Sequence, residues 1–195
     1  DGNPVKVVIT YTKYAQEHSH VKGSFYFNIQ INSNTQTQTG VIPVTLTAKG
    51  DGTVVPALAE SYEISEDGKT YTFTIRKGVK FHNGEELKAD DVLFTINKMM
   101  DPNAANVNSY QYEMIKGAND RLNGKAENVS GVKVIDDYTV EITLEKQYMP
   151  FLATLTSAPA SIFNRKAVEA GGDKFGFDPE FTVGTGYMKF KDWTQ

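Results

Sequence analysis

Residues 54–101 read VVPALAESYEISEDGKTYTFTIRKGVKFHNGEELKADDVLFTINKMMD, and this stretch decides the fold. It predicts a strand, a tight turn, a second strand, a loop and a helix. The Asp67-Gly68 pair supplies the backbone freedom that a hairpin turn needs. After the turn, apolar and polar side chains alternate with the period of two that is typical of a strand with one buried face. The apolar members of this strand are Tyr71, Phe73 and Ile75.

A helix is predicted to begin near Ala89. Asp90 and Asp91 fall in its first turn, where the helix dipole favours negative charge. Apolar residues follow at spacings of three and four, which gives the helix one apolar face. The residues of that face are Val92, Leu93, Ile96, Met99 and Met100. We expect Asp101-Pro102 to end the helix, because proline does not continue it.

Residues 131–145 repeat the design of the first hairpin. Apolar residues alternate with polar ones on both sides of a turn at Asp136-Asp137. This shared alternation predicts that the two hairpins, residues 61–76 and 131–145, lie in one continuous sheet. The single apolar face of the helix near residue 89 predicts that this helix covers the sheet.

Three more helices and one more strand are predicted. Ser109 is a suitable N-cap, and apolar residues then repeat every four positions, which predicts a helix that ends at Asn123. The repeating residues are Tyr110, Met114, Ala118 and Leu122. Shorter helices are expected over residues 150–155 and 164–170, and alternation predicts a last strand over residues 187–192.

The first fifty residues show two alternating stretches. Residues 5–11 and 25–31 each predict a strand, and the polar residues 33–40 predict a loop. Residues 41–47 fit either a strand or a short buried helix, and Pro43 weakens both interpretations.

Composition excludes several classes of function. The chain has 195 residues, a net charge of -4 and no cysteine. Disulfides, thiolate metal sites and a cysteine nucleophile are therefore excluded. The charge gives no reason to expect nucleic acid or an anionic membrane surface as a partner. No apolar run approaches the length of a membrane span, so we expect no membrane insertion of this chain.

The string VVPALAESYEISEDGKTYTFTIRKGVKFHNGEELKADDVLFTIN closely resembles the extracellular solute-binding proteins of the peptide, dipeptide and nickel ABC importers. The resemblance continues through residues 129–144, 150–152 and 183–186. It implies an α/β fold, the first lobe of a type II periplasmic-binding-protein architecture, with a mixed sheet of hairpins and packed helices. It also implies two regions, weakly matched N-terminal strands in residues 1–50 and a first-lobe domain in residues 51–195.

The resemblance implies a function in ligand capture for an ABC importer. The implied partners are a short peptide or other small solute and the transporter's permease, with no cofactor. The implied location is extracellular or periplasmic, where a lipid anchor can hold such a protein at the cell surface. Members of this family are usually two-lobed and more than twice this long, so we expect a truncated first lobe. The alternative is a stand-alone interaction or structural module derived from that lobe.

A serine–tyrosine pair shortly after the first helix commonly faces the peptide site in the resembled family. The matching residues here are Ser109, Tyr110 and Tyr112. Tyrosine suits this function, because its ring is apolar and its hydroxyl can bond to a peptide backbone. The alternative interpretation is that Tyr110 only extends the packing face of the predicted helix.

The remaining candidate residues for chemistry are histidines, a glycine-rich segment and adjacent carboxylates. His18 and His20 could share one face of a strand and bind a metal, but we expect both to be solvated because no third strong ligand is near. For His82, a hydrogen bond that fixes its loop is the favoured role, against a ligand or catalytic role. Gly184-Thr185-Gly186 lacks the context of a phosphate loop. With no triad and no converging carboxylates, we interpret the chain as non-enzymatic.

Overall fold

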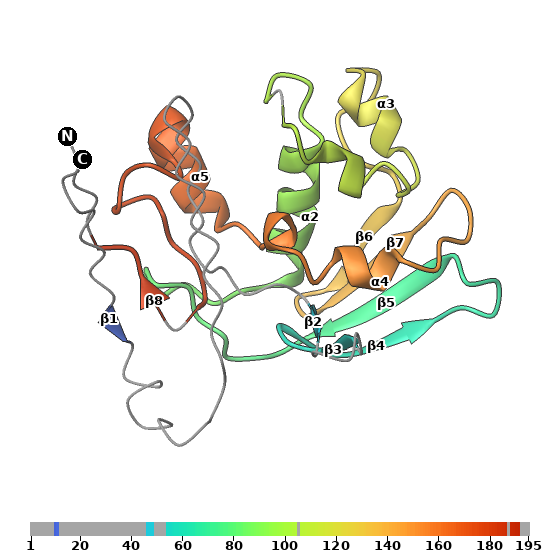
Figure 1. Cartoon of the computed structure of the whole chain (residues 1–195), viewed down its shortest axis with the longest axis horizontal. Helices are drawn as coiled ribbons and strands as arrows, with labels where there is room; N and C mark the ends of the chain where they lie inside the picture. The colour runs from blue at the N-terminus through green and yellow to red at the C-terminus, as the bar shows by residue number, and fades with distance from the viewer. Residues whose placement is uncertain (1–9, 12–45, 49–53, 105, 187, 192–195) are drawn as a thin grey trace, which may run out of the picture.

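A four-stranded antiparallel sheet is the centre of the fold (Figure 1). The computed structural model describes residues 10–11, 46–48, 54–104, 106–186 and 188–191. The strands of the central sheet are β4 (Ala59–Ile64), β5 (Thr70–Ile75), β7 (Thr139–Thr143) and β6 (Val132–Asp136), in the spatial order β4-β5-β7-β6. Two-residue and three-residue strands form two small pairs, β1 (Thr10–Tyr11) with β8 (Met188–Lys189) and β2 (Leu46–Ala48) with β3 (Val54–Pro56).

The two predicted hairpins share this sheet, as the alternation indicated. β5 pairs with β7 in antiparallel register, with Phe73 opposite Val140. Tyr71, Phe73 and Ile75 are at most 4% exposed, which confirms the predicted buried face. The predicted α/β fold class is therefore present, and every pairing among the described strands is antiparallel.

Helix α2 (Ala89–Met99) covers β6 and β7 (Figure 1). Its predicted start is confirmed, and the carboxylate of Asp91 accepts a hydrogen bond from the Lys88 amide at 2.9 Å. This bond satisfies one of the amide groups that a helix leaves unpaired at its N-terminus. The helix ends at Met99, just before Asp101-Pro102. Val92 and Ile96 are 3% and 2% exposed, so the predicted apolar face is buried.

The predicted helix over residues 109–122 is wrong. The structure has a 3₁₀ turn η1 (Ser109–Gln111) and a separate five-residue helix α3 (Ala118–Leu122). Between them Gly117 has φ +73°, which an α-helix cannot include. Lys116 instead exchanges backbone hydrogen bonds with the sheet, donating to Thr143 and accepting from Gly131. The residues spaced four apart therefore lie, in order, in a 3₁₀ turn, in a segment bonded to the sheet and in a short helix.

The remaining helices occupy their predicted places. They are α4 (Phe151–Thr154) and α5 (Arg165–Gly171), and the Asn164 side chain caps α5 by accepting a hydrogen bond from the amide of Ala167. Two further 3₁₀ turns are η2 (Ala158–Ala160) and η3 (Gly172–Lys174). In the described part of the chain, no helix is long and apolar enough to cross a bilayer.

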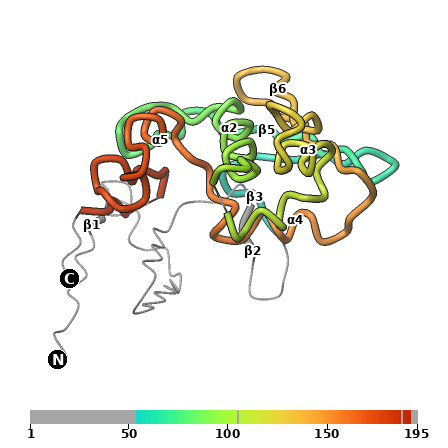
Figure 2. The backbone as a smooth tube through the Cα atoms, turned by 90° about the horizontal axis from the view of Figure 1, so that it is seen from above, coloured from blue at the N-terminus to red at the C-terminus, as the bar shows by residue number. Residues whose placement is uncertain are grey.

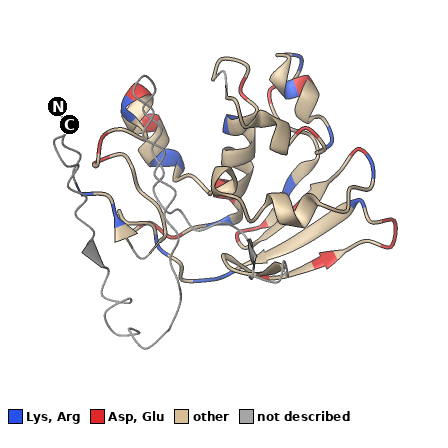
Figure 3. Ribbon diagram, viewed as in Figure 1, with Lys and Arg blue, Asp and Glu red and all other residues tan. Residues whose placement is uncertain are grey.

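The core lies between the sheet and the segments that cover it. Its largest fully buried side chains are Phe73, Phe151, Ile75, Leu87, Met100, Ile115 and Leu144. All of these belong to residues 54–163, which we call the sheet unit. Residues 164–191, which include α5 and β8, are called the C-terminal unit and lie to one side of it (Figure 2). Acidic and basic residues are interspersed over both units (Figure 3).

The N-terminal predictions lie mostly outside the described residues. Of the strand expected over residues 5–11, Thr10–Tyr11 is described and is a strand. Of residues 41–47, the described end belongs to β2, which favours the strand over the buried helix. The strand predicted over residues 25–31 and the loop over residues 33–40 are not among the described residues. The last strand is observed at Met188–Lys189.

Candidate functional site

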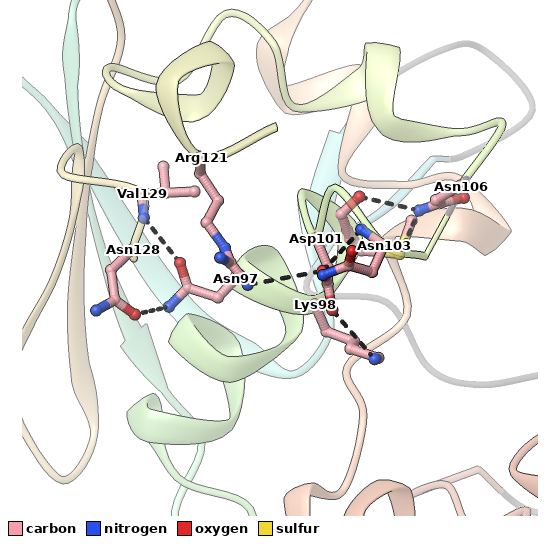
Figure 4. Close-up of polar contacts among 9 residues, drawn as sticks. Asn97, Lys98, Asp101, Asn103, Asn106, Arg121, Asn128 and Val129 are labelled. Carbon is pink, nitrogen blue, oxygen red and sulfur yellow. Dashed lines mark hydrogen bonds and ion pairs between the residues drawn. The ribbon is translucent and has the colours of Figure 1, made fainter. Parts of the chain in front are cut away.

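The segment between α2 and η1 is fixed by polar contacts (Figure 4). Asp101, just beyond the end of α2, accepts a hydrogen bond from the amide of Asn103 and lies 3.9 Å from the guanidinium of Arg121. The Asn103 amide bond, with Lys98 as a smaller contributor, holds the pKa of Asp101 below its ordinary value. Asn106 donates from its side chain to the carbonyl oxygen of Met99. These contacts set the path that leads into η1.

The three predicted site residues have different environments. Tyr110 is 61% exposed, and Ser109 beside it is half-buried. Tyr112 is 2% exposed and belongs to the core of the sheet unit. The pattern of two tyrosines two residues apart therefore places one ring toward solvent and the other inside. Contact of the three residues with a solute stays a prediction.

The buried hydroxyl of Tyr112 has a partner. It donates a hydrogen bond to the main-chain carbonyl of Pro159 at 3.1 Å, which connects η1 to η2. Burial raises the pKa of the Tyr112 phenol well above its ordinary value, because the phenolate would lose its hydration. Its hydroxyl thus holds two covering segments together.

Gln111 supports the exposed tyrosine, and sequence reasoning missed it. Its side chain is buried, and its oxygen accepts a hydrogen bond from the hydroxyl of Ser157 at 2.7 Å. Its amide nitrogen lies 3.5 Å from the hydroxyl oxygen of Tyr110. Because Ser157 holds the side-chain oxygen of Gln111, the side-chain nitrogen offers a fixed polar contact to the hydroxyl of the exposed Tyr110. No local pattern marks Gln111, since its partner lies forty-six positions further along the chain.

His82 fixes its loop, as predicted. Its backbone amide donates to the carbonyl of Gly184 at 2.9 Å, and its Nδ1 accepts from the amide of Gly184 at 3.2 Å. Its Nε2 lies 2.8 Å from the carbonyl oxygen of Gly186. The Phe81-His82-Asn83-Gly84 loop is therefore bound to the C-terminal unit. What the sequence did not reveal is that its partner is the Gly184–Gly186 segment.

The same loop holds the start of α5. Asn83 donates to the side-chain oxygen of Asn164 at 3.1 Å, and Asn164 donates to a carboxylate oxygen of Glu85 at 3.0 Å. Glu85 also forms an ion pair with Lys166, and this contact lowers the pKa of the carboxylate most strongly. One loop thus contacts two segments of the C-terminal unit.

The adjacent carboxylates have structural functions. Asp91 accepts the bond at the start of α2, and burial raises its pKa despite that contact. Asp136 is the last residue of β6, next to the turn of the second hairpin, and accepts a hydrogen bond from the Tyr138 amide at 2.8 Å. Asp137 forms an ion pair with Lys88 at 2.6 Å. The two carboxylates of each pair contact different groups, and Asp90 forms an ion pair with Arg165 at 2.9 Å.

No metal-ligand cluster is found in the described ranges, where three or more His, Asp or Glu side chains nowhere come together. His18 and His20, expected to be solvated, lie outside these ranges. Their state stays a prediction.

Comparison with known proteins identifies the larger part of the chain. Residues 53–195 match the family of bacterial extracellular solute-binding proteins, family 5, and residues 1–41 match a bacterial Ig domain. The dipeptide-binding protein of Escherichia coli K12 is 42% identical over 131 residues, covering 62% of this chain and 23% of that protein. Heme-binding protein A of Haemophilus influenzae is 38% identical over 156 residues, covering 74% of this chain and 27% of that protein.

Solved structures agree. Peptide-bound OppA of Listeria monocytogenes has a TM-score of 0.74 and 30% identity, covering 78% of this chain and 30% of that one. The substrate-binding domain of an oligopeptide ABC transporter from Bacillus anthracis has a TM-score of 0.75 and 33% identity over the same shares. The chain thus spans about a quarter of the length of the curated relatives named here. The match over residues 53–195, supported by sequence and by fold, shows that the chain belongs to family 5 of the bacterial extracellular solute-binding proteins.

Proposed function

We propose that this chain captures a small solute for an ABC importer, that its ligand is a short peptide, and that it does no catalysis. The carrying observation is its fold, which matches peptide-bound OppA at a TM-score of 0.74 with 30% identity. Membership of an extracellular family supports an extracellular or periplasmic location, and we propose a lipid anchor there. The permease of the importer is the proposed protein partner.

We assign this chain to the first lobe of a two-lobed protein. The relatives are about four times longer than the matched part, which supports a site completed by further residues. Residues 51–195 form the proposed first-lobe domain, and residues 1–50 form a separate N-terminal region. Closure of two lobes over a solute buries it more completely than one lobe can.

The proposed contact surface is the exposed ring of Tyr110 with Ser109 beside it. Tyr110 presents an apolar face and a hydroxyl, and the side-chain nitrogen of Gln111 lies 3.5 Å from that hydroxyl. Tyr112 contributes indirectly in this proposal, because its hydroxyl fixes the same turn to Pro159. Peptide ligands need both apolar contact and hydrogen bonds to their main chain.

An NMR titration tests the proposal. A pool of dipeptides to pentapeptides at millimolar concentration should shift the amide signals of Ser109 to Gln111 in the folded chain. Tyr110→Ala should abolish the shifts, whereas Val107→Ala should leave them, because Val107 is 84% exposed and lies three positions away. Hemin serves as a second ligand, because a heme-binding protein is among the relatives. Shifts with hemin and none with peptides would replace the peptide as the proposed ligand.

A second candidate function is an interaction or structural module. The match of residues 1–41 to a bacterial Ig domain favours it, because it places a domain of a different kind before the lobe. A folded chain whose spectrum responds to neither peptides nor hemin at millimolar concentration would support this module over solute capture.

A further inference from the structure

We propose that His82 positions residues 183–186, and with them β8, against the sheet unit, and that it does so only as a neutral ring with its proton on Nε2. The proposal does not depend on which solute the protein takes.

The hydrogen bonds define the protonation state. The amide of Gly184 can only donate, so Nδ1 of His82 must accept and carries no proton. In a neutral imidazole the other nitrogen then carries the proton. Nε2 therefore donates to the carbonyl oxygen of Gly186, 2.8 Å away. One side chain thus satisfies a donor and an acceptor of the same backbone segment.

His82 dominates the polar contacts of this segment. Among the described residues, each hydrogen bond recorded between residues 183–186 and the sheet unit involves the backbone or the ring of His82. Asn83 and Glu85 bond instead to Asn164, the N-cap of α5. The segment leads directly to β8, which pairs with Thr10–Tyr11. Among the described residues, the ring therefore makes two of the three hydrogen bonds that hold residues 183–186 to the sheet unit.

A charged ring does not fit the same geometry. An imidazolium has N–H groups on both nitrogens, so its Nδ1–H would face the N–H of Gly184 with no acceptor between them. The partners recorded for the ring are backbone atoms, and the 183–186 segment has no ionisable side chain. Glu85, three residues along the loop, is bonded to Lys166 and Asn164. The carboxylate of Glu85 is therefore already engaged away from the ring.

Three substitutions separate the two ring contacts. Asn places an amide oxygen near the position of Nδ1, and Gln places an amide nitrogen near that of Nε2. We expect His82→Asn to keep the exchange protection of the Gly184 amide and His82→Gln to lose it. His82→Ala should lower that protection tenfold or more. The carbonyl carbon shift of Gly186 should change in His82→Asn and least in His82→Gln. The amide of Thr143, which bonds to Gly131 within the sheet unit, is the internal control.

A spectroscopic measurement tests the tautomer directly. Long-range ¹H–¹⁵N spectra of the whole chain should show His82 with a protonated Nε2 and a bare Nδ1, and the His82 variants assign this ring against His18 and His20. A proton on Nδ1, or Gly184 protection unchanged in His82→Ala, would overturn the proposal. If His82→Ala does not fold, the Asn and Gln variants and the wild-type tautomer decide it.

Discussion

The hydroxyl of Tyr112 donates to the carbonyl oxygen of Pro159 at 3.1 Å, across forty-seven positions of sequence. The ring lies in the core at 2% exposure. Tyr112→Phe keeps the ring and removes the bond, so we expect a loss of about 0.5–1.5 kcal/mol in the free energy of unfolding at neutral pH. Chemical denaturation of both proteins measures it. A variant as stable as the wild type would show that the bond adds nothing to stability.

The same substitution has a signature at high pH. Burial raises the pKa of Tyr112 in the folded chain above the ordinary value of 10.0, so the unfolded chain loses this proton first as the pH rises. Stability that depends on the protonated phenol is therefore present below about pH 10 and is lost above it. The advantage of the wild type over Tyr112→Phe should shrink above pH 10. An advantage that grows with pH would contradict the assigned burial.

Ile96 is the test of how α2 covers the sheet. It is 2% exposed and lies on the face of α2 that packs over β6 and β7. Ile96→Ala should lower the free energy of unfolding by ~2–5 kcal/mol, as for other large-to-small changes in a core. Ile135→Ala is the matched control, because Ile135 is 58% exposed on β6, and it should cost less than ~1 kcal/mol. Equal losses in the two variants would mean that the helix face is not the buried one.

Asn97 connects α2 to the segment before β6. Its side-chain oxygen accepts from the buried amide of Val129 at 2.8 Å, and its nitrogen donates to Asn128 at 2.9 Å (Figure 4). Asn97→Ala leaves the Val129 amide without a partner, so we expect a loss of ~1–3 kcal/mol in the free energy of unfolding. Asn128→Ala removes only the exposed bond and should cost much less. Denaturation of the two variants side by side gives the comparison.

Gly117 and Gly124 separate backbone strain from a clash. Both have positive φ, +73° and +70°, which costs a residue with a side chain roughly 1–2 kcal/mol. A Cβ at Gly117 would lie 2.3 Å from the hydroxyl of Ser130, whereas in the described part of the chain no atom beyond the adjacent residues lies within 4 Å of one at Gly124. Gly117→Ala should therefore be the more destabilising of the two in thermal or chemical unfolding. Equal losses would show that Ser130 moves aside without cost.

Local patterns predicted the elements that depend on local geometry. Alternation around Asp67-Gly68 gave the first hairpin, and spacing of three and four gave α2, because burial of one face fixes both periods. The pairing of the two hairpins followed from their shared apolar faces. Edge strand β6 departs from strict alternation of buried apolar and exposed polar residues, because its apolar residue Ile135 is 58% exposed.

The failures come from contacts between distant residues. Residues 109–122 carry a helical spacing, but Ile115 forms a bridge to Leu144 and Gly117 turns the chain away. Contacts with the sheet fix this conformation, and no stretch of twenty residues contains both partners. In the candidate site, Tyr110 and Tyr112 look equivalent in the sequence, and the bond to Pro159 distinguishes them. The loop role of His82 could be predicted, whereas its partner 102 to 104 positions away could not.

The last prediction concerns affinity: this chain alone should bind peptides only weakly, with millimolar rather than micromolar affinity. The part matched to its relatives is about a quarter of their length, so much of a two-lobed site lies outside it. A lone lobe leaves one side of the ligand in water, and each missing hydrogen bond costs ~0.5–1.5 kcal/mol of binding free energy. Since every ~1.4 kcal/mol is a tenfold change in affinity, a few lost bonds turn a micromolar ligand into a millimolar one. Calorimetry against a pool of dipeptides to pentapeptides, with a two-lobed protein that continues this sequence as the control, measures the difference. Micromolar binding by the 195-residue chain itself would mean that its site is complete, and that capture between two lobes is the wrong mechanism for this protein.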